Sequence, residues 1–214
     1  MGEFDTADRT VAVAMQRLRD EGLIYVVPGG GWYVRKSRGV VRSTRNRLSR
    51  AERAAGRGTF SSDCHAAGLT PDVDTEVGTA LAPGSVAGEL DIEPGAPVIV
   101  RDRIMRAEGE VLQLATSYLP ADLAEVAPAV AEEDTGPGGI YARLDDAGLT
   151  LTEFVETVVI GRASEHEARQ MDLTPGDPVY RITRVAWTAE RAVETNHITI
   201  TGDRYELRYE LPAE

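Results

Sequence analysis

The chain has 214 residues, a formal net charge of −12 and a hydrophobic content of 42%. These values fit one or two globular domains with a hydrophobic core and exclude a wholly disordered chain. No apolar run is long enough to span a membrane, no signal-peptide pattern is present, and the single cysteine, Cys64, offers no internal disulfide. We therefore expect a cytoplasmic protein that does not contact a membrane.

The charge is divided unevenly along the chain. Residues 1–57 contain 12 Arg or Lys and six Asp or Glu, whereas residues 58–214 contain 11 and 29. A small basic segment joined to a large acidic domain suggests that only the N-terminal part meets an anionic polymer such as DNA.

The N-terminal part, residues 1–36, predicts one helix followed by a small β-hairpin. Val11, Met15 and Leu18 recur at helical spacing and share one face of the helix. Two short strands around a glycine-rich turn follow at Leu23–Val27 and Trp32–Val34. A helix followed directly by such a hairpin is the second half of a winged helix.

A basic linker is predicted at residues 37–57. Between residues 35 and 57 the chain carries nine basic residues and a single acidic one, Glu52. We expect an extended segment that turns helical near Ser49–Ala55. Two interpretations stay open, a solvated spacer without a partner or a segment that follows the phosphates of DNA.

Residues 58–214 predict a domain of mixed α and β structure. Five helices are expected, at Ser61–Ala67, Ser85–Leu90, Ala121–Val130, Gly139–Ala147 and Ser164–Met171, the last with a capping box. Seven strands are expected, at Val73–Leu81, Val98–Arg106, Val111–Tyr118, Leu151–Ile160, Val179–Trp187, Val193–Thr201 and Tyr205–Leu211.

An internal repeat is the most informative feature of this domain. The segment Leu90–Val98, with its Pro-Gly-x-Pro-Val ending, recurs as Met171–Val179 at an offset of 81 residues. At the same offset, Arg103 corresponds to Arg184, Gln113 to Glu194 and Ala115 to Asn196. The repeat therefore predicts a duplicated helix–strand–strand unit whose strands all pair in one antiparallel sheet. A cavity between the two halves is the natural ligand site.

These motifs resemble a known family of regulators. Phe4–Val11, with the helix after it and the Gly29–Val34 hairpin, is similar to the recognition helix and wing of GntR transcriptional regulators. The later domain resembles the UTRA effector domain of the HutC-like branch, through the duplicated Pro-Gly motif, Arg103 and these segments: Ser117–Pro120, Gly139–Tyr141, Val193–Glu194 and Gly202–Tyr205. The resemblance implies an α+β, chorismate-lyase-like effector fold that commonly dimerises.

The resemblance also implies how DNA would be contacted. The family has two further helices before the recognition helix, so residues 1–36 are expected to be a partial winged helix-turn-helix, loosely folded or held by a partner. Ala7, Asp8 and Ala12 stand where the family usually has Ser or Arg. The remaining candidates for DNA binding are Thr6, Arg9, Thr10, Gln16, Arg35 and Lys36.

In relatives that sense sugar phosphates, an Arg-x-Arg pair binds the phosphate, and here the pair is Arg103 and Met105. This departure argues against the usual amino-sugar phosphate, unless Arg101 or Arg184 compensates. Arg103 and Arg184 could equally form structural salt bridges, and Tyr141 could belong to the core.

Seven residues are the candidates for effector binding: Arg103, Ser117, Tyr118, Tyr141, Glu156, Glu194 and Asn196. Glu194 and Asn196 alternate on one strand and therefore share a face. Ser117 and Tyr118 are neighbours on a strand, so only one of them can line the pocket.

We expect a ligand-responsive bacterial regulator, a repressor as is usual in the family, that binds operator DNA and a small molecule and forms a homodimer through the UTRA domain. Two rivals are a truncated effector-binding and dimerisation module without DNA binding of its own and, from fold analogy alone, a chorismate-lyase-like enzyme. His65, His166 and His197 are far apart in the sequence, and no nucleophile, phosphate-loop or metal-ligand motif is present. We therefore expect no catalytic site, metal or cofactor.

Overall fold

The computed structural model describes residues 8–21, 23–27, 29–34, 40–43, 48–56 and 58–210. The chain divides into two compact units, Met1–Arg38 and Gly39–Glu214.

The first unit contains the helix and hairpin that the sequence predicts. Helix α1 (Asp8–Asp20) is followed by the antiparallel strands β1 (Ile24–Val27) and β2 (Gly31–Val34). Part of its apolar surface is exposed, since Val13 is 63% and Val34 74% exposed. Exposed apolar side chains contribute little to stability, so this unit has only a small core.

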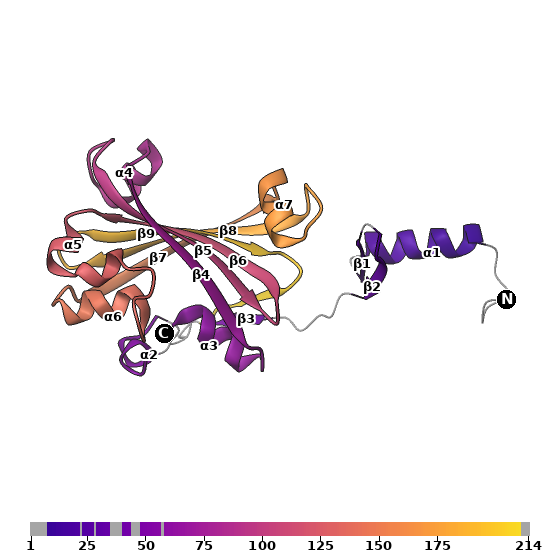
Figure 1. The fold of residues 1–214 in the computed structure, drawn as a ribbon, viewed down its shortest axis with the longest axis horizontal. Helices are drawn as coiled ribbons and strands as arrows, with labels where there is room; N and C mark the ends of the chain where they lie inside the picture. Colours follow the sequence, from indigo (N-terminus) through magenta and orange to yellow (C-terminus); the bar gives the residue numbers. More distant parts are fainter. Residues whose placement is uncertain are drawn as a thin grey trace. The chain divides into compact units, whose positions relative to one another are not determined.

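The second unit is built on a six-stranded sheet in the order β4-β5-β6-β9-β8-β7, with every neighbouring pair antiparallel (Figure 1). Burial alternates along β6 and β8, as expected for strands with one well-covered face. The strands are β4 (Pro71–Leu81), β5 (Pro97–Ala107), β6 (Glu110–Pro120), β7 (Leu151–Arg162), β8 (Pro178–Thr188) and β9 (Ala192–Thr201).

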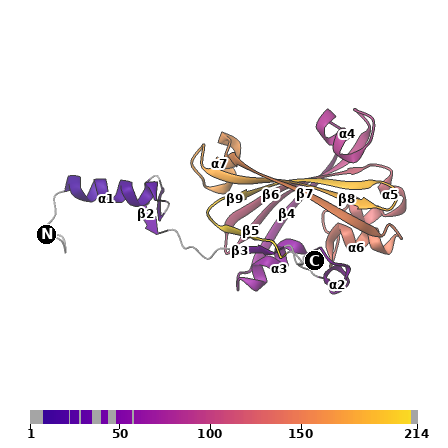
Figure 2. The ribbon, with the colours of Figure 1, turned by 180° about the vertical axis from the view of Figure 1, so that it is seen from behind.

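Helices cover both faces of this sheet. The helices after the linker are α3 (Thr59–Ala66), α4 (Gly84–Leu90), α5 (Leu123–Val126), the 3-10 helix η1 (Pro128–Ala131), α6 (Gly139–Asp146) and α7 (Glu165–Met171). Figures 1 and 2 show α3, α5 and α6 on one side of the sheet, here called the α3/α6 face, and α4 and α7 at opposite ends of the other side, the α4/α7 face.

The duplication predicted from the sequence is visible in the fold. Helix α4 leads into β5 and β6, and α7 leads into β8 and β9. Both helices end at an aspartate in the left-handed region, Asp91 with φ 54° and Asp172 with φ 52°. The two halves meet where β6 pairs with β9.

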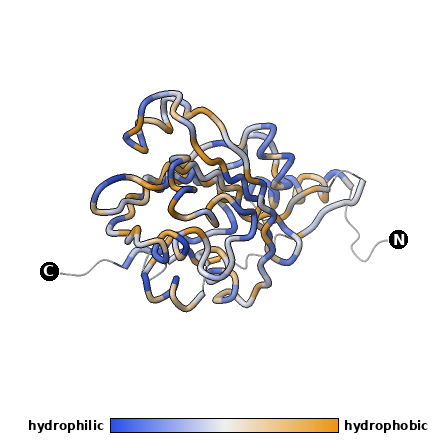
Figure 3. Tube along the Cα trace, turned by 60° about the vertical axis from the view of Figure 1, so that its left-hand side comes forward, coloured by the Kyte–Doolittle hydropathy of each residue, from blue (hydrophilic) through white to orange (hydrophobic). Residues whose placement is uncertain are grey.

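The core consists of separate apolar clusters on the two faces. On the α3/α6 face, one cluster gathers around Phe60 and Cys64 of α3, and another around Leu123 and Leu144 under α5 and α6. Smaller clusters lie under α4 and α7. Figure 3 shows the apolar and polar stretches of the chain interleaved through the domain, in keeping with this division. Between the two larger clusters, the middle of the α3/α6 face carries polar side chains.

Two predicted elements differ from the structure. The helix expected at Ala121–Val130 is two short helices, α5 and η1, because Pro128 lacks the amide hydrogen that a continuous helix needs and Ala127 before it is non-helical. Strand β10 (Tyr205–Arg208) does not join the large sheet as expected, but pairs in parallel with β3 (Val40–Ser43).

The predicted linker, residues 37–57, also differs from the expectation of an extended spacer. Its residues Val40–Ser43 form β3, and its predicted helix is present as α2 (Arg50–Ala54), capped by the Ser49 side chain. Arg42 and Arg53 are 3% and 6% exposed because they pair with carboxylates of the second unit. These two arginines therefore cannot follow DNA phosphates.

Candidate ligand-binding site

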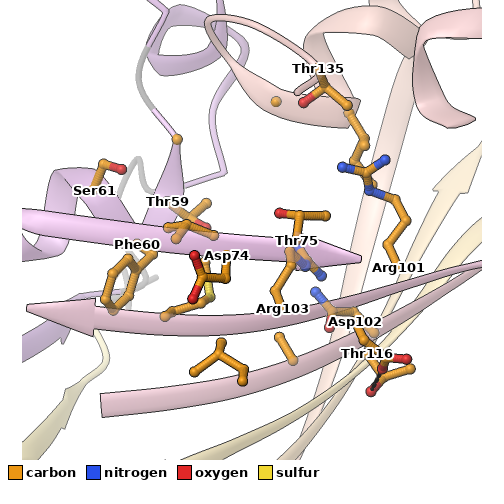
Figure 4. A pocket seen from close by; sticks show the side chains of 18 of the residues that line it. Thr59, Phe60, Ser61, Asp74, Thr75, Arg101, Asp102, Arg103, Thr116 and Thr135 are labelled. Carbon is orange, nitrogen blue, oxygen red and sulfur yellow. Dashed lines mark hydrogen bonds between the residues drawn. The ribbon is translucent and has the colours of Figure 1, made fainter. Parts of the chain in front are cut away.

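A hollow of about 1480 Å³ lies against the sheet and includes the polar middle of the α3/α6 face. Its walls are formed by α3, β4 to β6, residues 133–139, α6, β8 and β9, and it extends to residues of the α4/α7 face. Figure 4 shows Arg103 and Thr75 in the middle of the hollow, Thr59 and Phe60 on one side, and Arg101 with Thr135 on the other.

Strand register brings the polar side chains together. Ser117 of β6 lies opposite Arg101 of β5 and opposite Asn196 of β9. Arg103 comes two residues after Arg101 and Glu194 two residues before Asn196, so both side chains share this face. The site therefore forms where the two halves of the duplication meet.

A buried carboxylate organises the centre of the site. Glu194 is 1% exposed, and its Oε1 accepts a hydrogen bond from Ser117 Oγ at 2.5 Å. Its Oε2 accepts from the Tyr141 hydroxyl of α6, and Arg103 donates to Ser117 Oγ. The chain of hydrogen bonds from Arg103 through Ser117 and Glu194 to Tyr141 links the sheet to helix α6.

Three arginines surround this carboxylate. Arg101 donates to the carbonyl oxygens of Val130 at 2.9 Å and Glu133 at 3.0 Å, and also to that of Glu132, so it holds the segment after η1. Arg184 is 4% exposed and lies over the Tyr141 ring, 5.7 Å from its centroid. The cavity wall is therefore strongly cationic.

Burial and mutual repulsion perturb these groups. Burial, with the charge of Arg103 adding to it, lowers the pKa of Arg101 to about 10, and burial also lowers the pKa of Arg103. Burial raises the pKa of Tyr141, which keeps its hydroxyl protonated as a donor. For Arg184, burial acts to lower the pKa, but its interactions with Tyr141, Glu194 and Glu156 outweigh burial and raise it. Clustered shifts of this kind are typical of binding sites.

The site has more hydrogen-bond donors than the described residues satisfy. The buried Nε atoms of Arg101, Arg103 and Arg184 and Nη1 of Arg184 have no hydrogen-bond partner there, and neither does the acceptor Asn196 Oδ1. Buried polar atoms in native proteins are normally satisfied. An anionic molecule with at least one donor would complement this arrangement.

The structure places most of the predicted effector residues together. Arg103, Tyr141, Glu194 and Asn196 line the hollow, and Ser117 joins them through the hydrogen bonds just described. Whether they contact a ligand stays a prediction.

Two predicted effector residues lie elsewhere. Tyr118 points to the α4/α7 face, where its ring lies 5.5 Å from that of His197, because side chains alternate along β6. Glu156 does not line the hollow and pairs instead with Arg42 of β3 and Arg184 of β8.

Sequence reasoning named Arg101 and Arg184 only as possible substitutes for the missing arginine of the Arg-x-Arg pair. Both lie on the cavity side with Arg103, so the predicted compensation is geometrically available. The spacing of two residues between Arg101 and Arg103 was the signal that they share a face. No sequence signal assigned Thr75 or Thr135 to the site.

The DNA-binding candidates belong to the first unit. Arg9, Thr10 and Gln16 are exposed on α1, and Gln16 Nε2 donates to Asp20 Oδ1 at 2.8 Å. Arg9 and Gln16 are seven residues apart and share a helix face. Thr6, Arg35 and Lys36 lie outside the described residues.

Within the described part of the chain, no helix is long and apolar enough to cross a membrane. The same residues contain no group of three or more His, Cys, Asp or Glu arranged to hold a metal ion.

The model of the UTRA domain matches residues 74–206, more than half of the chain. An HTH-type transcriptional regulator of Rhizobium meliloti is 30% identical over 97% of this chain and 81% of its own length. A crystal structure of a GntR-family transcriptional regulator shares the fold, with a TM-score of 0.68 over 99% of this chain and 85% of that chain at 26% identity. The chain belongs to the GntR family of transcriptional regulators and carries a UTRA domain. The repeats and the Glu194 site both fall within this domain.

Further relatives agree with this assignment. The HTH-type transcriptional repressor PhnF of Mycolicibacterium smegmatis is 24% identical over 94% of this chain and 77% of its own. The crystal structure of PhnF from Mycobacterium smegmatis shares the fold, with a TM-score of 0.68 over 99% of this chain and 88% of that chain at 22% identity. The structure of its effector domain has a TM-score of 0.62 over 72% of this chain and 94% of that chain. Matches across both units support a regulator rather than an isolated effector-binding module.

Proposed function

We propose that this UTRA regulator is a repressor that binds operator DNA through its first unit and is controlled by a small anionic effector in the cavity around Glu194. The observation that carries the proposal is that Arg101, Arg103 and Arg184 line one hollow and that each has a buried N–H group without a hydrogen-bond partner among the described residues. An anionic group would satisfy them with charge-assisted hydrogen bonds, which are stronger than neutral ones.

The asymmetry between the two repeats indicates which arginine meets the effector. On the strands beside Arg184, the facing positions hold Glu156 and Asn196. At the corresponding positions beside Arg103 stand Thr75 and Ala115, which carry no charge. Arg184 has a carboxylate of its own on a neighbouring strand, whereas Arg103 lacks one and is the better partner for an anionic ligand.

The remaining parts of the proposal concern assembly, location and chemistry. We expect a cytoplasmic homodimer joined through the UTRA domain, because paired DNA-binding units read paired half-sites. We expect no catalytic turnover, since both carboxylate oxygens of Glu194 already accept hydrogen bonds, from Ser117 and Tyr141, and the relatives are transcriptional regulators. The sign of regulation follows the PhnF relative, which is a repressor.

A thermal-shift screen of small carboxylates, phosphates, phosphonates and sulfonates tests the effector class. A ligand at a hundred times its Kd stabilises by about 2.7 kcal/mol, which for a domain of this size corresponds to a rise in Tm of roughly 5–11 °C. Arg103→Ala should abolish the shift. Arg106→Ala is the matched control, because Arg106 directly follows Met105 on β5 and pairs with Asp74 outside the Glu194 network.

Two results would overturn the proposal. The first is an anion panel without any stabilising member, and the second is a stabilising anion whose effect survives Arg103→Ala. DNA binding is tested separately by fluorescence anisotropy with operator DNA, where Arg9→Ala should weaken binding and reduce its salt dependence. An affinity that does not change in Arg9→Ala would remove this residue from the interface.

A further inference from the structure

Three charged side chains share one contact beside the cavity. Arg42 of β3 donates through Nη2 to Oε1 of Glu156 on β7. Nη1 of Arg184 on β8 lies 3.7 Å from the same oxygen. The side chains are 3%, 15% and 4% exposed, respectively, so two buried cations meet one carboxylate oxygen.

This arrangement makes the two arginines competitors. Like charges at short range repel, and screening by water is weak for buried groups. A carboxylate oxygen that turns towards Arg184 weakens its bond to Arg42, and the reverse also holds. Arg184 also lines the cavity, and its charge interacts with that of Arg103, so an anion bound at Arg103 would offset the charge of Arg184 as well.

The other arginine anchors the first element of the second unit. Strand β3 begins two residues after the boundary between the units. It is four residues long and, among the described residues, pairs only with the four-residue β10. Val40 packs in the apolar cluster around Phe60, and Val40 N donates to Arg204 O at 2.8 Å. So short a parallel pair has little stability of its own, which makes the Arg42–Glu156 contact important for its docking.

We propose that Glu156 couples the cavity to β3, so that an anion neutralising Arg184 strengthens the Arg42–Glu156 ion pair and docks β3 more tightly. This rests on the proposed function for the identity of the neutralising anion. Release of β3 would add four residues, about 13 Å at full extension, to the chain that connects the two units. Ligand occupancy would thereby set the reach of the DNA-binding unit.

Hydrogen exchange of the β3 amides in the full chain tests this coupling through variants alone. Glu156→Gln should speed exchange at residues 41–43 by about tenfold, because a buried Arg42 loses its counter-charge. Arg184→Gln should slow exchange at the same amides several-fold, although residue 184 does not lie on β3. In the double variant Glu156→Gln/Arg184→Gln, the slowing of β3 exchange caused by Arg184→Gln should disappear, because the carboxylate that the two arginines share is absent.

Two controls separate coupling from general damage. Glu153→Gln changes an exposed glutamate on the same strand and should leave β3 exchange unchanged. Exchange at the β9 amides reports the stability of the sheet and is measured in every variant. Arg184→Met is the second variant if Arg184→Gln does not fold, because replacing a buried ion by an apolar chain of similar length is often tolerated.

The coupling is wrong if neutral variants of Arg184 speed β3 exchange as Glu156→Gln does, or if their effect persists without Glu156. Addition of inorganic phosphate to the wild type and to Glu156→Gln then tests the ligand arm, with slower β3 exchange expected in the wild type only. If β3 exchange slows in the Arg184 variants and speeds up in Glu156→Gln, but phosphate has no effect, the coupling is upheld and phosphate is rejected as its effector. The same thermal-shift screen decides independently whether any anion binds.

Discussion

Removal of the Tyr141 hydroxyl should destabilise the UTRA domain measurably. In Tyr141→Phe the ring keeps its edge contact with Phe154, whose centroid is 5.1 Å away, and its place under Arg184. What is lost is one hydrogen bond to Oε2 of the buried Glu194. A hydrogen bond to a charged buried group contributes about 1.5–3 kcal/mol, so we expect the free energy of unfolding to fall by that amount.

Urea unfolding followed by circular dichroism measures this loss, as a lower midpoint with an unchanged slope. At about 2–4 °C per kcal/mol for a domain of this size, the Tm should fall by roughly 3–12 °C. Tyr209→Phe is the control, because Tyr209 is 51% exposed and its variant should stay within about 0.5 kcal/mol of the wild type. A Tyr141→Phe variant as stable as the control would refute the buried network.

The second hydroxyl on the same carboxylate extends this test. Ser117→Ala removes the donor to Oε1 of Glu194, so the double variant with Tyr141→Phe leaves a buried carboxylate without either hydroxyl. The combined loss should exceed the sum of the single losses by about 0.5–3 kcal/mol, the range for residues in one network. Strict additivity would mean that the two hydroxyls act on independent sites.

Three further predictions follow from other buried groups. Arg53→Met removes the partner of buried Asp145 and should cost about 3–5 kcal/mol in urea unfolding, whereas the exposed Arg50→Met should cost almost nothing; equal losses would argue against the ion pair. The hydrogen bond from Arg181 lowers the pKa of Glu167 to about 2, so its stabilisation is present above the ordinary value of 4.5 and is lost as the pH falls from there towards 2. Glu167→Gln should therefore lose up to about 3 kcal/mol at pH 7 and flatten the acid limb of the stability curve; an unchanged acid limb would contradict the shift. Burial raises the pKa of Cys64 to about 11, so iodoacetamide at pH 8 should modify it in urea but not in the native protein, and rapid native labelling would show that the thiol is accessible.

Much of the fold was predictable because its signals are local. The strands of the large sheet show runs of apolar and alternating residues and were placed to within a few residues, and the offset of 81 residues revealed the duplication. The errors came from tertiary context. Nothing local in residues 40–43 or 205–208 distinguishes a strand of a small parallel pair from a linker or from a strand of the main sheet.

The candidate site was predictable only in part. Alternation on a strand places Glu194 with Asn196, and the repeat relates Arg103 to Arg184. Nothing in the sequence showed that Glu156 lies outside the hollow, because its partner Arg42 is 114 residues away, in a segment that composition alone describes as a basic linker. Long-range ion pairs leave no periodic pattern in the sequence. A basic segment that is exposed to solvent therefore looks the same in sequence as one whose arginines are buried in ion pairs.

The position of the polar network supports a binding role over a purely structural one. A sheet between two apolar clusters could be completed by apolar side chains in its middle rows, and buried ion pairs are often no more stabilising than such replacements. This sheet instead places Arg103, Ser117 and Glu194 there, beside a hollow, and the Nε of Arg103 has no hydrogen-bond partner in the described part of the chain. A stabilising network would satisfy its own donors, since a partly satisfied one costs stability. The unsatisfied donors at the junction of the two repeats are therefore best explained by a molecule that completes them, which is what an effector domain requires.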